Sequence, residues 1–132
     1  MNILRSKVDV YRVLAACIFI SILGGTWDAW SHDAVGPHGL LSPQHLMLGI
    51  PTIIAMVVSA WAWRSYHDRW FAYLTFAFLA EPVSAPFDAW WHAYYGIELA
   101  KSPMVIWSPP HILLLSGVLV ACLLVIPKIA KD

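Results

Sequence analysis

The sequence predicts an all-α integral membrane protein in which one domain, residues 1–132, forms a four-helix bundle. Of the 132 residues, 60% are hydrophobic and only 12% are charged, a composition typical of membrane-embedded chains. Four apolar stretches are long enough to cross a hydrocarbon core of about 30 Å, which takes roughly 17–25 helical residues. We place these stretches at Val10–Trp30, Gln44–Trp63, Trp70–Trp91 and Pro110–Pro127.

The first stretch is interpreted as a membrane span and not as a signal peptide. It is long, and it ends in the segment Trp27–Trp30 where a signal peptide would have small residues at a cleavage site. The second stretch begins behind Ser42 and Pro43. Serine is a preferred helix N-cap and proline suits the first helical position, so this pair predicts where the second helix starts.

The third stretch carries an acidic residue, Glu81, which is followed by Pro82 and Pro86. The two prolines are expected to kink this helix, because proline removes a backbone hydrogen bond and clashes with the preceding turn. The fourth stretch begins behind Ser108 and Pro109, the same start signal as in the second.

The basic residues predict the orientation in the membrane. Seven of the eight lie in the N-terminus, the 64–69 loop or the C-terminus: Arg5, Lys7, Arg12, Arg64, Arg69, Lys128 and Lys131. Only Lys101 lies in the other two loops, so the positive-inside rule puts both termini in the cytoplasm. The loops 31–43 and 96–109 then face outward. The tryptophans cluster at the ends of the spans, as interfacial anchors do.

A motif of one aspartate and two histidines occurs twice in the chain. The two copies are Asp28, His32 and His45, and Asp88, His92 and His111. The copies align at an offset of 60, which slips to 66 at the second histidine. We therefore expect two parallel helix hairpins, at about 10–63 and 70–127, related by a pseudo-two-fold axis along the membrane normal. Both motifs should then lie near the outer surface.

Each motif is predicted to form a metal site. Asp28 and His32 are four positions apart, which places them on one helix face, and His45 falls in the first turn of the returning helix. Two imidazoles and one carboxylate suit Cu(II), Fe(II) or Zn(II), and a bound cation offsets the cost of removing such groups from water. The alternative is an Asp–His hydrogen bond that pins helix ends. Motifs within about 4 Å of each other would hold a dinuclear centre, and otherwise two mononuclear sites.

The acidic residue Glu81 is a further candidate functional residue. It lies seven positions before Asp88, which is about 10 Å deeper in the membrane at 1.5 Å per residue. Ionisable groups at such depth usually serve function, so we expect a proton relay or an additional ligand. The alternative is a hydrogen bond to a carbonyl freed by the prolines. Its counterpart in the first half is Ser21, and nearby Gly24 and Gly25 allow close helix contact.

The remaining histidines and the cysteines have ordinary interpretations. His38 is expected to be a solvated loop residue, with an auxiliary ligand as the alternative, and His67 a surface residue of the inner loop. Cys17 and Cys122 lie inside apolar spans and lack CxxC spacing, so we expect small core residues and no disulfide. Net charge is zero and no basic patch indicates nucleic-acid binding.

The Asp28, His32 and His45 spacing resembles the copper-binding segment of a transmembrane subunit in the copper membrane monooxygenases, the particulate methane and ammonia monooxygenase family. In that family an Asp-x3-His-x12-His triad on transmembrane helices binds copper, and a second triad that begins with asparagine also binds it. The second motif looks like the counterpart of that second triad. It departs from the family in its aspartate, Asp88, and in the longer gap between His92 and His111.

Three function classes follow. The first is a copper-dependent membrane oxidoreductase, monooxygenase-like, or a subunit of one, with iron or zinc as alternative metals and a small apolar substrate. The second is a non-catalytic copper-binding protein for storage or delivery. The third is a haem b membrane protein, which leaves the repeated aspartates without a role. The expected partners are the lipid bilayer and other membrane subunits or further copies of the chain.

Overall fold

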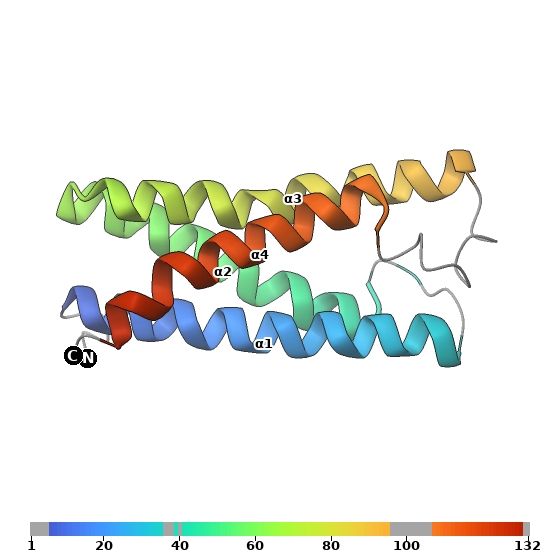
Figure 1. Ribbon diagram of the computed structural model, residues 1–132, viewed down its shortest axis with the longest axis horizontal. Helices are drawn as coiled ribbons and strands as arrows, with labels where there is room; N and C mark the ends of the chain where they lie inside the picture. The colour runs from blue at the N-terminus through green and yellow to red at the C-terminus, as the bar shows by residue number, and fades with distance from the viewer. Residues whose placement is uncertain (1–5, 36–38, 40, 96–106, 131–132) are drawn as a thin grey trace.

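The computed structural model describes residues 6–35, 39, 41–95 and 107–130. These residues form four α-helices and no strand, which confirms the all-α prediction. The helices are α1 (Lys7–Ala34), α2 (Pro43–Tyr66), α3 (Arg69–Tyr95) and α4 (Pro109–Ile129) (Figure 1). Each helix extends one to four residues beyond the predicted apolar stretch at both ends.

The four helices lie along one common axis and are connected as consecutive hairpins (Figure 1). Helix α1 packs against α2 and α4, and α3 packs against the same two neighbours. The pairs α1–α3 and α2–α4 are therefore diagonal to each other. Both chain termini lie at one end of this bundle, and the two connections after α1 and α3 lie at the other (Figure 1).

Polar residues define where the helices begin. Ser6 caps α1 in a reciprocal capping box with Asp9. Ser42 is the N-cap of α2 and its hydroxyl accepts a hydrogen bond from the backbone N–H of His45, as the Ser-Pro signal predicts. Ser108 is the N-cap residue of α4, but its side chain makes no capping bond. The N-cap positions are thus confirmed in both hairpins, and the capping bond in the first.

The core is formed mainly in the half of the bundle that holds the chain ends. Its largest fully buried side chains include Phe71, Leu14, Leu74 and Val10. The Tyr11 ring stacks on Phe71, with 4.9 Å between ring centroids. These two residues are sixty positions apart and come from the diagonal helices α1 and α3, so their contact closes the centre of the bundle.

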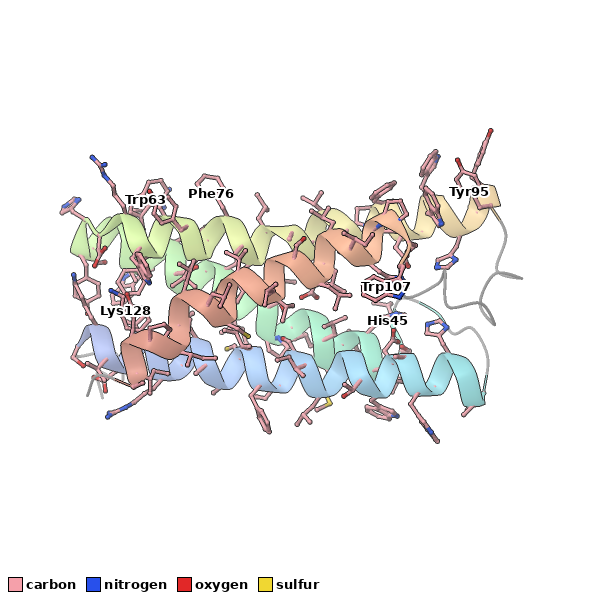
Figure 2. The ribbon with its side chains drawn as sticks, viewed as in Figure 1. His45, Trp63, Phe76, Tyr95, Trp107 and Lys128 are labelled. Atoms are coloured by element: carbon pink, nitrogen blue, oxygen red, sulfur yellow. The ribbon has the colours of Figure 1, made fainter. Side chains whose placement is uncertain are left out.

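Apolar side chains also cover the outside of the bundle. Large hydrophobic residues are exposed on all four helices, and Figure 2 shows Phe76 pointing away from the other helices. Three helices, α1, α2 and α4, are long and apolar enough to cross a membrane. Only 39%, 28% and 17% of their most apolar windows are buried within the chain. Such an apolar exterior is typical of a protein in contact with lipid.

Helix α3 is not among those three helices, although its 27 residues exceed the roughly 20 needed to span a bilayer. Its glutamate, prolines and tyrosines lower its mean hydropathy. The helix runs without interruption through Pro82 and Pro86. The expectation of four spanning helices is therefore confirmed for three, and a crossing by α3 stays a prediction.

Close packing between α1 and α2 depends on one glycine. A Cβ atom added to Gly24 would lie 2.6 Å from the backbone nitrogen of Leu48 and 2.7 Å from the carbonyl carbon of Met47. A Cβ atom on Gly25 would make only an ordinary contact of 3.7 Å with the Leu48 side chain. The predicted close helix contact is confirmed at Gly24.

The ordinary interpretations of the cysteines and of one histidine are also confirmed. Cys17 is buried in the core, Cys122 packs against the core, and both are unpaired thiols. His67 is exposed and adopts a left-handed backbone conformation, with φ of 51°, at the end of α2. His38 lies outside the described residues.

Candidate metal centre

The two Asp/His/His sets lie at the same end of the bundle, away from the chain termini. In each set the aspartate and first histidine belong to the last turns of α1 or α3, and the second histidine belongs to the first turn of α2 or α4. Figure 1 shows these four helix ends together, and Figure 2 places His45 among them. The predicted pairing of a helix end with the start of the returning helix is therefore present in both hairpins.

In the first set, both imidazoles meet one carboxylate. The Nε2 atom of His45 lies 3.3 Å from Oδ1 of Asp28, and Nε2 of His32 lies 3.7 Å from Oδ2. The centroids of the two imidazole rings are 6.1 Å apart. Asp28 is mostly enclosed, with 15% of its side chain exposed. One donor atom from each of the three residues can be chosen so that all lie within 4.8 Å of one another.

The far side of the His45 ring is also held. Its Nδ1 atom lies 3.1 Å from the carbonyl oxygen of Gly39 and 3.1 Å from the hydroxyl of Ser42. A carbonyl only accepts hydrogen bonds, so Nδ1 carries a hydrogen directed at it. In the neutral ring Nε2 then presents a lone pair toward the Asp28 carboxylate. Two such lone pairs attract only if a proton or a metal ion lies between them.

The second set repeats this arrangement on α3 and α4. The Oδ1 atom of Asp88 lies 3.3 Å from Nε2 of His92 and 3.6 Å from Nε2 of His111. The ring centroids are 6.3 Å apart, close to the value in the first set. The Nδ1 atom of His111 lies 2.9 Å from the hydroxyl of Ser108. Each N-cap serine therefore contacts the imidazole of the histidine three residues later.

One oxygen of the second set is left unsatisfied. Oδ1 of Asp88 is buried and has no hydrogen-bond partner among the described residues, although two imidazole nitrogens lie within 3.6 Å. A buried carboxylate oxygen without a partner is costly. A cation placed between Asp88, His92 and His111 would satisfy this oxygen and both nitrogens.

The two sets differ in detail. Among the described residues, only Asp28, His32 and His45 form a group whose donor atoms all lie within 4.8 Å. In the first set the amide of Gln44 donates to the hydroxyl of Ser31, 3.1 Å away, and thereby links α2 to α1 beside the site. Proline and tryptophan occupy the aligned positions in the second set. The second set is therefore the looser one.

The observed spacings fit a shared transition-metal ion. Two donors that each lie about 2.1 Å from one ion in a tetrahedral site are about 3.4 Å apart. The aspartate–histidine distances are 3.3 and 3.7 Å in the first set and 3.3 and 3.6 Å in the second. Three protein donors leave at least one coordination position open for water, oxygen or a substrate.

Aromatic side chains surround this end of the bundle. Trp30, Trp90 and Trp107 are exposed, as interfacial anchors require, and Figure 2 shows Trp107 near His45 in the view along the bundle. The Trp91 ring packs on Tyr95 with 4.3 Å between centroids. These residues frame the site, and none of them lines either of the two best-formed pockets in the described part of the chain.

Glu81 lies in the centre of the bundle, apart from the two sets. Its side chain is 9% exposed, it is hydrogen-bonded to Thr52, and its Oε2 atom has no hydrogen-bond partner among the described residues. The Thr52 hydroxyl lies 3.0 Å from that of Ser21. Sequence reasoning identified Glu81 but missed Thr52, because a lone threonine in an apolar span gives no signal of its own. The repeat alignment alone had pointed to Ser21.

The chain matches no family model, no curated protein and no solved structure.

Proposed function

We propose that the protein binds transition-metal ions, copper in the first place, through its two Asp/His/His sets at the outer end of a membrane-spanning bundle. The observation that carries this proposal is the shared carboxylate in each set. Two imidazole nitrogens approach one aspartate at distances near those of ligands around one ion. A hydrogen bond that merely pins two helix ends would not require the second histidine.

The bundle is proposed to consist of two parallel hairpin repeats, with both termini in the cytoplasm. Residues sixty positions apart on α1 and α3 meet at the centre, as equivalent residues beside a two-fold axis should. Tyr11 stacks on Phe71, and Ser21 lines the same cavity as Glu81. Lys7, Arg64, Arg69 and other basic residues lie near the end that holds the termini, which supports the inner side by the positive-inside rule.

Copper is preferred over iron and zinc because of the resemblance to the copper membrane monooxygenases, whose first triad has the spacing of Asp28, His32 and His45. Imidazole and carboxylate ligands suit all three metals, so the donor set alone does not choose. Each pair of imidazoles surrounds its own aspartate. This supports two mononuclear sites over one dinuclear centre.

The proposed role is that of a metal-dependent membrane oxidoreductase, or a subunit of one, acting on a small or lipid-soluble substrate. When bound, copper would supply redox chemistry and open coordination positions. The aspartates would offset its charge, and Ser42 and Ser108 would orient the imidazoles through their Nδ1 atoms. Glu81, the buried acid between the two hairpins, would donate or accept protons.

The proposal is tested by elemental analysis of protein purified in detergent and supplemented with copper, iron or zinc. We expect about two equivalents of one metal per chain after removal of free ions, since each set binds one ion. Less than roughly a tenth of an equivalent with every metal would contradict the proposal, because neutral imidazole and ionised carboxylate should then be available to bind. Oxygen-dependent turnover with a reductant would support the oxidoreductase role.

A second candidate function is non-catalytic copper storage or delivery. The observation that favours it is the accessibility of the sites, since the histidine side chains of both sets are 23–29% exposed at the end of the bundle. An ion held there can pass to a partner protein. Metal transfer to a copper chelator without any oxygen consumption would favour this role. A haem site is not supported, because the imidazoles of each pair converge on a carboxylate.

A further inference from the structure

A small cavity lies in the middle of the bundle, and all four helices contribute to it. Its volume is about 20 Å³, and a cavity needs roughly 10–15 Å³ to hold one water molecule. The polar residues that line it are Ser21 from α1, Thr52 from α2 and Glu81 from α3. Three polar side chains are enough to hold one water.

The cavity lies where the two proposed repeats meet. Its lining contains three pairs of residues that occupy aligned positions in the two halves: Ile18 and Phe78, Ser21 and Glu81, and Thr52 and Val118. Residues related in this way converge only near a pseudo-two-fold axis. The polar members nevertheless occur once each, so the cavity has one polar site and not two.

The hydroxyl groups beside Glu81 form a short chain. Thr52 is hydrogen-bonded to the Glu81 carboxyl group, and its Oγ1 atom lies 3.0 Å from Oγ of Ser21. Both hydroxyls also reach the carbonyl oxygen of Leu48, at 3.1 and 3.0 Å. This carbonyl is a fixed acceptor at the far end of the chain.

This chain can serve either protonation state of Glu81. When Glu81 carries a proton, it donates to Thr52, and the Thr52 hydrogen turns to Leu48. When Glu81 is ionised, the Thr52 hydrogen turns to the carboxylate, and Ser21 continues to donate to Leu48 or turns to Thr52. Rotation of hydroxyl groups is the only change required, so both states keep their hydrogen bonds.

The oxygen that the chain does not reach is Oε2 of Glu81, which is buried and has no partner among the described residues. Within the described part of the protein, no other titratable side chain lines the cavity: α1 contributes Ile18 and Ser21, α2 contributes Thr52, and α4 contributes only apolar residues and glycine. Gly49 of α2 leaves room for the carboxyl group, since a Cβ there would lie 3.2 Å from Oε1. An ionised Glu81 thus has no basic counter-ion among the residues that line the cavity.

We propose that this cavity binds one water molecule and that Glu81, Thr52, Ser21 and the water form a single proton-loading site shared by the two halves of the bundle. Bulk water supplies the proton, a lone pair of Oε2 accepts it through the cavity water, and the reverse step returns it to water without any transfer of electrons. Ser21 and Glu81 each lie seven residues, about 10 Å, from the aspartate of their own helix. The inference deepens the proposed function, on which its link to the metal sites rests.

The test is infrared difference spectroscopy of the full chain in lipid, without added metal, as the pH is changed. We expect a C=O stretching band of a protonated carboxylic acid that appears and disappears reversibly with pH and shifts in D2O. Glu81→Gln should abolish this band. Thr52→Val should shift it, since valine occupies the aligned position 118, whereas Thr75→Val, which removes a hydroxyl bonded to Ser59 elsewhere in the bundle, should not.

A band that never depends on Glu81, or one that never changes with pH while the protein stays folded, would overturn the proposal. Should Glu81→Gln fail to fold, the Thr52→Val and Ser21→Ala shifts decide the question with Glu81 in place. The metal content of Glu81→Gln separates the two proposals. Failure of the triads to bind metal leaves the infrared result unchanged, and loss of the band leaves the metal content unchanged.

Discussion

Nε2 of His45 lies 3.3 Å from Oδ1 of Asp28, while Nδ1 of the same ring lies 3.1 Å from the Gly39 carbonyl oxygen. The ring is thus held between an acceptor that fixes its hydrogen and a carboxylate that faces its lone pair. This geometry joins the start of α2 to the end of α1, and a similar contact joins His111 to Asp88 in the other hairpin. The predictions below follow from these contacts and from the packing that positions them.

Removal of one second histidine should empty one site. His45→Ala and His111→Ala should each lose about half of the bound metal, and the double variant nearly all of it, because distant independent sites contribute additively. Metal content is measured by elemental analysis after removal of free ions. The control is His67→Ala, which removes an exposed histidine at the other end of the bundle. Near-total loss in either single variant would indicate a dinuclear centre.

The N-cap serines should affect metal binding in both hairpins but stability in only one. Ser42→Ala removes a capping bond and should cost about 1 kcal/mol of folding stability. Ser108 makes no capping bond, so Ser108→Ala should cost clearly less. Both variants lose a contact to Nδ1 of a ligand imidazole, and metal affinity should fall about 10- to 100-fold in each.

Thermal unfolding in detergent and metal titration measure the two effects separately. Equal stability losses in Ser42→Ala and Ser108→Ala would contradict the capping argument. Unchanged metal affinity in both variants would show that the serines do not orient the imidazoles.

The contact between α1 and α2 should tolerate a methyl group at one glycine and not at its neighbour. Gly24→Ala places a Cβ against the backbone of α2, which cannot move aside easily, and should destabilise the protein by about 1–3 kcal/mol. Gly25→Ala is the matched control and should stabilise α1 by about 0.5–1 kcal/mol, because alanine is the better helix former. The midpoint of thermal unfolding should fall in the first variant and rise in the second. The opposite order would contradict the packing.

The inner end of the bundle should show a pH-dependent contribution from Asp68. A hydrogen bond from the Lys7 side chain, followed by one from the backbone of Trp70, holds the pKa of the Asp68 carboxyl below its usual range. The ionised form is therefore favoured in the folded state. This contribution is present above the unfolded-state pKa of about 3.9 and is lost as the pH falls through the lower folded-state value.

Asp68→Asn keeps a good N-cap for α3 but removes the charge, so it should lose this acid-dependent part alone. Asp68→Ala should lose about 1 kcal/mol more, since the cap is then removed as well. The Lys7–Asp68 pair is exposed, so we expect the charge effect to be the smaller one. Unfolding midpoints compared at neutral and acidic pH distinguish the two variants. An identical pH profile in wild type and Asp68→Asn would contradict the prediction.

Much of this arrangement could be predicted from spacing. Asp28 and His32 are one helical turn apart, and Ser42 with Pro43 fixes where α2 begins, so His45 has to face the end of α1. The hydrophobic stretches predict the helices to within four residues at each end. The polar residues beyond those stretches still continue the helical hydrogen-bond ladder, which is why the observed helices are longer.

Other features depend on how the helices are rotated against each other, which spacing does not reveal. The Thr52 hydroxyl reaches Glu81 only because α2 and α3 pack as neighbours. The link from Gln44 to Ser31 likewise crosses from α2 to α1. The repeat alignment suggested equal sites, whereas among the described residues only the first set brings its donor atoms within 4.8 Å. A pattern of residue types cannot resolve differences of this size.

The most direct test of the proposed metal sites is electron paramagnetic resonance of the protein loaded with Cu(II). The account predicts a signal with hyperfine coupling from imidazole nitrogen, present in wild type and lost when His32, His45, His92 and His111 are all replaced by alanine. An identical copper signal in that quadruple variant, or no specifically bound copper in the wild-type protein, would contradict it.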